Sequence, residues 1–215
     1  MLQILVKNNQ FIAFNKPAGV AVQADKTGDQ TFLAQAEAYC HHPLHAVHRI
    51  DRPVTGVVLF AKSKSAMTVL TRQFEERTVE KEYLAIVKDA PPQPEGTLVH
   101  WLRKNEAKNI SQAFEEEKPG TERAELQYKV LASSENYHLL LVRPLTGRHH
   151  QIRAQLAAIG CPVKGDVKYG ARRGNKDRSI NLHAWRLAFN HPVNRERVRL
   201  EAPLPEDALW KSFEF

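Results

Sequence analysis

Asp51 is the residue best placed to do chemistry, because two arginines flank its carboxylate. Residues 48–56 read HRIDRPVTG, and a segment over residues 57–62 that is apolar up to Ala61 follows them. Nearby positive charges favour the ionised form of a carboxylate. An ionised Asp51 suits a nucleophile, a base or an ion-pair partner, and suits a proton donor poorly. On local chemistry alone, a salt bridge in a loop that leads into a strand is the simpler explanation.

Two further side chains could complete a site around Asp51. Tyr83 lies where residues 80–87 change from alternating charged and apolar positions to a continuous apolar run. Arg153 lies at the border of the apolar face of a helix expected over residues 149–159. A carboxylate nucleophile beside an aromatic ring, on a phosphate-binding face, suits work on a flipped nucleobase. The common alternative for Tyr83 is a core position with a satisfied hydroxyl.

The positive charge of the chain is concentrated in its second half. The formal net charge is +7, and residues 143–199 hold 13 Lys and Arg against 3 Asp and Glu. Residues 75–125 hold 8 against 12. A one-sided basic region indicates a polyanion partner, since neutralised phosphates release their counterions. A solvated basic face without function is the alternative, and the asymmetry favours nucleic acid.

Four histidines within residues 41–48 raise the possibility of a metal site. Imidazole is a common metal ligand, and His41, His42 and His45 would be the core of a metal-enzyme hypothesis. Pro43 disrupts the helical spacing that would align them, and no Cys or acidic cluster supplies further ligands. A polar or RNA-facing loop is therefore the better interpretation. No P-loop or dinucleotide motif is present either.

Strands with a few flanking helices must position these residues. Strands are expected over residues 2–6, 11–15, 57–62, 80–87, 97–104, 123–130, 137–142, 181–190 and 197–201. Thr31 and Ser63 are typical N-caps for two helices, and a short helix is expected within residues 205–215. Residues 105–122 are polar and predict an exposed excursion, and residues 165–170 a glycine-punctuated loop. The succession indicates an α+β fold with a mixed or antiparallel sheet.

Six blocks of sequence together resemble the signature of the RluA-type pseudouridine synthases. They follow the order of that family and lie between about residue 11 and residue 192. The blocks are residues 15–19, 48–56, 81–85, 146–153, 165–170 and 182–184. The resemblance implies the pseudouridine synthase fold, with a mixed, mostly antiparallel sheet, a central catalytic cleft and flanking helices. It implies an isomerase, formally an intramolecular transferase, that converts uridine to pseudouridine in structured tRNA or rRNA and that needs neither a metal nor a cofactor.

The resemblance also assigns roles to individual residues. Asp51 is expected to be the nucleophile or base, which attacks the ribose carbon or the uracil ring, or removes a ribose proton. Tyr83 would stack on the base and take the carbon-5 proton, and Arg153 would pair with Asp51. Arg49 would fill the stack when the target base flips out. The remaining candidates for substrate binding are Arg52, Arg148, His149, Gln151, Lys164, Lys168 and Arg172.

The chain departs from the family pattern at two places. Val54 and Thr55 stand where Thr-Ser is usual, and Gln155 stands where a histidine is usual. Asp51, Tyr83 and Arg153 are intact, which argues against the alternative function, a catalytically silent RNA-binding protein of the same fold.

The wider organisation follows from length and composition. At 215 residues, with the catalytic pattern beginning by residue 11, we expect one catalytic domain over residues 1–215 without the S4 domain of larger relatives. The chain has two cysteines, no signal-peptide pattern and no apolar stretch near the roughly 20 residues of a membrane helix. These features predict a cytoplasmic protein without a membrane anchor, and we expect a monomer.

Overall fold

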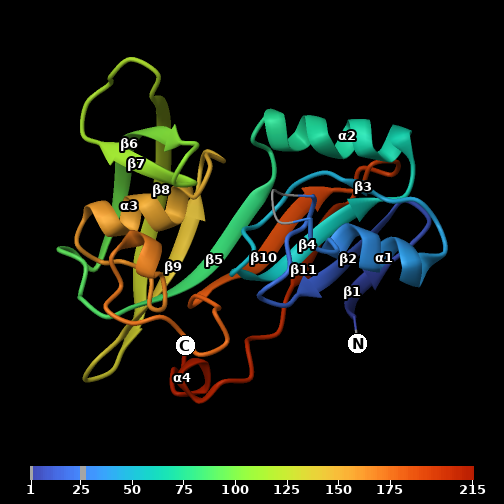
Figure 1. The fold of residues 1–215 in the computed structure, drawn as a ribbon. Helices are drawn as coiled ribbons and strands as arrows, with labels where there is room; N and C mark the ends of the chain where they lie inside the picture. Colours follow the sequence, from blue (N-terminus) through green and yellow to red (C-terminus); the bar gives the residue numbers. More distant parts are fainter. Residues whose placement is uncertain (1, 25–27) are drawn as a thin grey trace. The chain divides into compact units, whose positions relative to one another are not determined.

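The computed structural model describes residues 2–24 and 28–215, which form two compact units. The first unit contains the chain up to Lys81 together with His183–Pro205, and the second contains Glu82–Leu182 and Glu206–Phe215. Figure 1 shows the elements of both units. Of the helices in the described ranges, none is long and apolar enough to cross a membrane.

The first unit is a sheet with a helix on each face. Its strands follow the order β1–β2–β4–β10, with β3 paired to β4 and β11 paired to β10. The pairs are antiparallel except for β4 and β10, which run parallel. The strands are β1 (Gln3–Lys7), β2 (Phe11–Lys16), β3 (His45–Ala46), β4 (Thr55–Ala61), β10 (Leu182–Asn190) and β11 (Arg197–Glu201), and the helices are α1 (Phe32–Cys40) and α2 (Lys64–Glu75).

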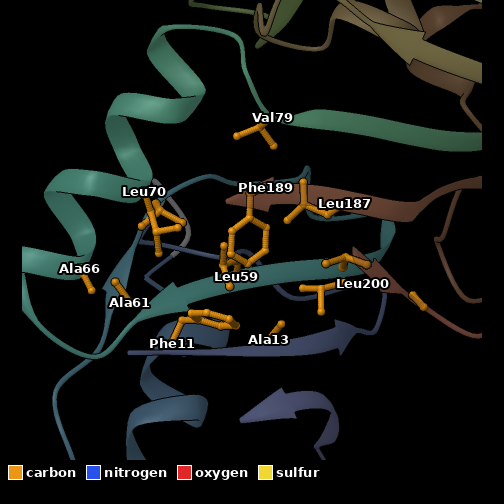
Figure 2. Packing of buried hydrophobic residues seen from close by; sticks show 13 residues of the cluster. Phe11, Ala13, Leu59, Ala61, Ala66, Leu70, Val79, Leu187, Phe189 and Leu200 are labelled. Atoms are coloured by element: carbon orange, nitrogen blue, oxygen red, sulfur yellow. The ribbon is translucent and has the colours of Figure 1, made fainter. Parts of the chain in front are cut away.

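Strand β4 is apolar from Val57 to Ala61, where both of its faces are covered. Leu59 and Ala61 belong to a buried cluster with Ala66 and Leu70 of α2, which Figure 2 shows beside Phe11, Phe189 and Leu200. On the other face, the Phe60 ring lies 6.2 Å from that of Phe32 in α1. The continuous apolar run read from the sequence is thus explained by helices on both sides.

Both helices of the first unit begin where the sequence predicts. The Thr31 hydroxyl accepts a hydrogen bond from Ala34 N at 3.1 Å, and the Ser63 hydroxyl accepts one from Ala66 N at 3.2 Å. Each bond satisfies a backbone donor that the first helical turn leaves without an intrahelical acceptor.

The second unit is an antiparallel sheet in the order β5–β9–β8–β6–β7, with α3 against it. Its elements are β5 (Glu80–Val87, which belongs to this unit from Glu82 on), β6 (Glu95–Asn105), β7 (Ile110–Phe114), β8 (Glu122–Ser133), β9 (His138–Pro144), α3 (Gln151–Ala158), the 3-10 helix η1 (Val167–Tyr169) and α4 (Ala208–Lys211). The α+β class with mostly antiparallel pairing is as expected from the sequence.

Three sequence-based expectations about the second unit need correction. Residues 105–122 are not only an exposed excursion, because they contain β7, which pairs with β6 from Ile110 to Phe114. Helix α3 begins at Gln151 rather than at residue 149, since His150 adopts the left-handed conformation with φ of 51°. The loop over residues 165–170 includes the turn of η1.

Candidate active site

Asp51 lies in a loop of the first unit that backbone hydrogen bonds fix at both ends. Val54 N donates to Asp51 O at 3.0 Å, which closes the turn. Gly19 N donates to Arg52 O at 2.9 Å and joins this turn to the loop after β2. Two of the six sequence blocks, 15–19 and 48–56, therefore form one structure around Asp51, which is itself partly buried.

Lys16 fills the space beneath these two loops, a role that the sequence analysis missed. The side chain is fully buried, and Nζ donates to the carbonyl oxygens of Pro17, Val20 and Arg52 at 2.7, 2.9 and 3.3 Å. Burial lowers the pKa of Lys16 from 10.5 to about 7, while the charge of Asp51 raises it and that of Arg52 lowers it. The signal was present, because Lys16 falls two positions after buried Phe14 on the same face of β2.

The far end of the Asp51 loop is held by β10. The Thr55 hydroxyl lies 2.7 Å from His183 Nδ1, and His183 is fully buried, which lowers its pKa to about 4. Gly56 has φ of +116°, and a Cβ there would lie 2.2 Å from Ala184 O. Only glycine permits this approach, so block 182–184 acts by fixing where the loop ends.

The two arginines beside Asp51 differ in their surroundings. Arg49 is exposed, as a side chain that contacts RNA must be. Arg52 is partly buried, and its Nη1 lies 2.7 Å from Asp29 Oδ2. Asp29 was not anticipated from the sequence, because it lies outside the six blocks.

Within the histidine-rich segment, His48 has a structural role. Its Nε2 accepts a hydrogen bond from Leu59 N at 3.0 Å, and its ring stacks on Phe74 with centroids 4.9 Å apart. Burial, helped by the charge of Lys81, lowers the pKa of His48 well below 6.5, so the ring stays neutral and can accept this bond. Within the described ranges, no three His, Cys, Asp or Glu side chains gather as they would around a metal ion. The metal-enzyme hypothesis for His41, His42 and His45 gains no support.

Tyr83 lies in the second unit, on β5, where the strand passes from partly exposed to buried positions. Tyr83 is partly buried and every residue from Leu84 to Val87 is buried. In the sheet, Tyr83 stands opposite Val142 of β9. Beside it, the Glu82 carboxylate accepts a hydrogen bond from Arg143 Nε at 2.8 Å. Tyr83 therefore lies at the edge of a core.

Arg153 is buried on α3 and forms a bidentate ion pair with Asp166. Its Nε lies 2.6 Å from Asp166 Oδ2 and its Nη2 lies 2.9 Å from Asp166 Oδ1, with side chains only 4% and 2% exposed. The guanidinium also lies over the Tyr169 ring, 5.0 Å from its centroid. The expectation that Arg153 borders the packed face was wrong, because all six residues from Gln151 to Leu156 are buried.

Tyr169 links this ion pair to the β6–β7 hairpin. Its hydroxyl accepts a hydrogen bond from Ser111 N at 2.7 Å and lies 2.9 Å from His150 Nδ1. The Ser111 hydroxyl donates to His149 O at 2.7 Å and lies 2.9 Å from His149 Nδ1. The unpredicted strand β7 therefore helps to place the start of α3.

The sequence-predicted RNA contacts at the start of α3 have partners inside the second unit. Gln151 is buried, and its Oε1 accepts hydrogen bonds from Thr146 Oγ1 at 2.7 Å and Arg148 N at 2.9 Å. Arg148 Nη1 lies 2.5 Å from a Glu122 carboxylate oxygen. His149 Nε2 lies 3.1 Å from Asn109 Oδ1. These contacts order the turn before α3, and Gln151, which is buried, uses both polar atoms of its side chain in hydrogen bonds there.

The three candidates for substrate binding that follow α3 differ in how exposed their side chains are. Lys164 Nζ donates to Asn175 Oδ1 at 2.8 Å and to Asn181 Oδ1 at 3.4 Å. Lys168 is exposed and its Nζ lies 3.5 Å from Asn109 O. Arg172 is exposed on the loop after η1. Lys168 and Arg172 are therefore open to solvent, whereas Lys164 organises its own loop.

Gln155, where the sequence departs from the family pattern, anchors α3 to the sheet. It is fully buried, and Nε2 donates to Leu98 O at 3.0 Å and to Ala124 O at 3.3 Å. Thr55, the other departure, holds His183 as described above. The chain thus supplies hydrogen-bond partners for Gln155 Nε2 and for the Thr55 hydroxyl, whereas the buried Oε1 of Gln155 has none among the described residues.

The family model for RNA pseudouridylate synthases matches residues 10–158. The chain belongs to this family. The resemblance to RluA-type pseudouridine synthases is thereby confirmed, and with it an isomerase that acts on uridine in RNA.

Two curated relatives are similar to this chain over nearly its whole length. The tRNA pseudouridine synthase C of Pasteurella multocida is 31% identical over 97% of this chain and 93% of that protein. The ribosomal large subunit pseudouridine synthase C of Vibrio parahaemolyticus is 34% identical over 94% of this chain, which spans only 65% of that protein.

A solved structure is similar as well. Human RNA Pseudouridylate Synthase Domain Containing 1 has a TM-score of 0.81 and 28% sequence identity, covering 98% of this chain and 88% of that chain. The pseudouridine synthase fold is therefore confirmed.

Proposed function

We propose that this pseudouridine synthase acts on uridines of tRNA or rRNA, with Asp51 as its nucleophile or base. The observation that carries the role of Asp51 is the construction of its loop. The Lys16 ammonium donates a hydrogen bond to the carbonyl oxygen of Arg52 in this loop. The contact between Thr55 and His183 fixes the end of the loop, and Gly56 permits the close approach to β10. A carboxylate on a loop fixed in this way is preorganised for chemistry rather than left to sample solvent.

The proposed reaction begins with cleavage of the glycosidic bond between the ribose and N1 of uracil. Asp51 attacks the ribose carbon or the ring, or removes a ribose proton. The detached uracil rotates and rejoins the ribose through carbon 5, whose proton is then lost. Asp51 is regenerated, and N1 gains a proton as carbon 5 loses one, so the isomerisation is redox-neutral and leaves the composition of the nucleotide unchanged.

We assign supporting roles to Tyr83 and Arg153 by the same resemblance. Tyr83 stacks on the uracil and accepts the carbon-5 proton. Arg153 keeps Asp51 ionised and oriented, because an opposite charge favours the carboxylate form. The support for Arg153 is its rigid setting between Asp166 and the Tyr169 ring.

RNA binding requires that the target base leave its stack, which costs a few kcal/mol. We propose that exposed Arg49 fills the gap and that Arg52, Arg148, His149, Lys168 and Arg172 contribute contacts to the RNA. Gln151 and Lys164, whose polar atoms bond within the chain, act by ordering their loops.

We also propose that the two units make one catalytic domain, with the central cleft that the resemblance implies. The support is that the family model spans residues 10–158 and so includes parts of both units. A monomer in the cytoplasm stays a prediction.

Release of tritium from RNA labelled at uridine carbon 5 tests the proposal, because pseudouridine formation exchanges that hydrogen. We expect release by the native chain and none by Asp51→Ala. Parallel reactions with separated tRNA and rRNA pools identify the substrate class. RNA binding without release from either pool would instead indicate the catalytically silent alternative.

A further inference from the structure

The loop of residues 171–178, between η1 and β10, concentrates positive charge on the surface of the second unit. Arg172, Arg173, Lys176 and Arg178 occupy four of seven consecutive positions, and all four are exposed. In the parts of the chain that the structure describes, none of these four forms an ion pair with a carboxylate. Asp177 is the only acidic residue among them, and its Oδ1 accepts hydrogen bonds from the backbone N and hydroxyl of Ser179 at 3.1 and 2.7 Å.

Several other exposed arginines of the chain form ion pairs with carboxylates. Arg72, Arg143 and Arg186 lie within 2.7 Å of the carboxylates of Glu76, Glu82 and Glu201. Exposed cations without such a partner also occur elsewhere, but they are scattered along the sequence. The clustering in residues 171–178 is what distinguishes the loop.

The loop is held in shape by a network of polar side chains beneath it. Lys164 Nζ donates to Asn175 Oδ1 at 2.8 Å, and Asn175 Nδ2 donates to Asn181 Oδ1 at 2.9 Å and to Ser179 Oγ at 3.1 Å. A Cβ at Gly165 would lie 2.8 Å from Asn175 Nδ2, so the network leaves no room there for a side chain. A loop ordered before binding loses less entropy when it binds.

A backbone hydrogen bond connects the loop to the surroundings of Arg153. Ala171 N donates to Asp166 O at 3.1 Å, and Asp166 is the ion-pair partner of Arg153. The start of the loop is therefore fixed to the residue that orients a proposed catalytic side chain.

The chemistry of the loop matches phosphate better than bases. Residues 171–178 contain no aromatic side chain on which a base could stack, and the amide of Asn175 is used inside the loop. Arg and Lys contacts to phosphates position a nucleic acid without reading its sequence.

We propose that residues 171–178 form a phosphate-docking loop, which binds the RNA backbone through Arg172, Arg173, Lys176 and Arg178. This inference rests on the proposed function for the nature of the polyanion. The loop raises the affinity for RNA of any sequence and leaves the chemical step unchanged.

Neutralising the four cations tests the proposal. The variant carries Arg172→Gln, Arg173→Gln, Lys176→Gln and Arg178→Gln. The matched control carries Lys64→Gln, Lys88→Gln, Arg195→Gln and Arg199→Gln, four exposed cations from three separate parts of the sequence. Thermal unfolding of both variants verifies that they fold.

The first measurement is the affinity for RNA between 50 and 200 mM salt, by fluorescence anisotropy. Four lost phosphate contacts should make the slope of log K against log salt shallower by about 3. The native chain should then lose about 60-fold more affinity over this range than the loop variant. The control should change the slope by less than about 1.

Activity and sequence dependence complete the test. The loop variant should show a raised KM for tritium release and a kcat within about twofold of native, with equal loss of affinity for two RNAs of the same length but different sequence. An unchanged slope, an equal effect of the control, or a loss confined to one RNA sequence would overturn the proposal. Loop-dependent RNA binding by a native chain that releases no tritium would overturn the proposed function and leave the docking loop standing.

Discussion

Substitution of Asp166 by Asn should destabilise the protein strongly, because it removes a charge that faces a buried guanidinium. The Asp166 and Arg153 side chains are 2% and 4% exposed and are joined by contacts of 2.6 and 2.9 Å. Removing one member of a buried ion pair typically costs about 3–5 kcal/mol, since the other charge remains out of water. For a chain of this size, that cost corresponds to a fall in Tm of roughly 6–20 °C.

The matched control is Glu122→Gln, which removes the carboxylate beside Arg148. That contact is as short, at 2.5 Å, but the Glu122 side chain is 63% exposed. Exposed ion pairs contribute about 0–1 kcal/mol, because solvent screens them. The control should therefore lower Tm by no more than about 4 °C.

Thermal and urea unfolding, followed by circular dichroism, measure both variants. A double variant, Asp166→Leu with Arg153→Met, should recover part of the stability lost in Asp166→Asn, since the buried charge is then gone as well. Equal and small shifts in Tm for Asp166→Asn and Glu122→Gln would refute the reasoning that burial makes the pair strong.

Three further predictions concern the loop that carries Asp51. Gly56→Ala should lower the free energy of unfolding by about 3 kcal/mol or more, because the added Cβ would lie 2.2 Å from Ala184 O. The control Gly160→Ala also has positive φ but open space around it, and should lower the free energy of unfolding by about 1–2 kcal/mol. Equal losses for the two variants in urea unfolding would contradict this prediction. Lys16 has a pKa of about 7 in the folded protein and 10.5 when exposed, so between pH 7 and pH 10.5 the unfolded chain binds more protons than the folded one. The free energy of unfolding should therefore rise with pH in this range, by at most about 1.4 kcal/mol per pH unit. Lys16→Met should remove that slope, and urea unfolding at pH 7 to 10 that shows the same slope in both proteins would disprove it. Thr55→Val should cost about 1 kcal/mol in urea unfolding by deleting the 2.7 Å contact with His183, and no measurable loss would show that the contact does not hold the loop.

Local patterns were sufficient for the parts of the fold that depend on nearby residues. Thr31 and Ser63 cap helices through the residue three positions later, so their role is visible in a short window of sequence. Strand β7 was missed because Ile110–Phe114 is a short edge strand, defined by its pairing with β6 rather than by an apolar run.

Buried charges were the part of the site that the sequence could not place. A periodicity argument treats Arg153 as polar and puts it at the border of a packed face. Its burial depends on Asp166, thirteen positions away, which lies beyond the helix. The burial of Lys16 likewise depends on the carbonyl of Arg52, 36 positions away. Compensation of a charge by a distant partner is a property of the tertiary structure.

The central claim is that Asp51 performs the chemistry, and Asp51→Asn tests it most directly because it keeps the shape of the side chain. The measurement is the single-turnover rate of tritium release from carbon-5-labelled RNA, at protein concentrations where anisotropy shows the RNA bound. The account predicts RNA binding close to that of the native chain and release at the background rate. Release by Asp51→Asn at the native rate would contradict it.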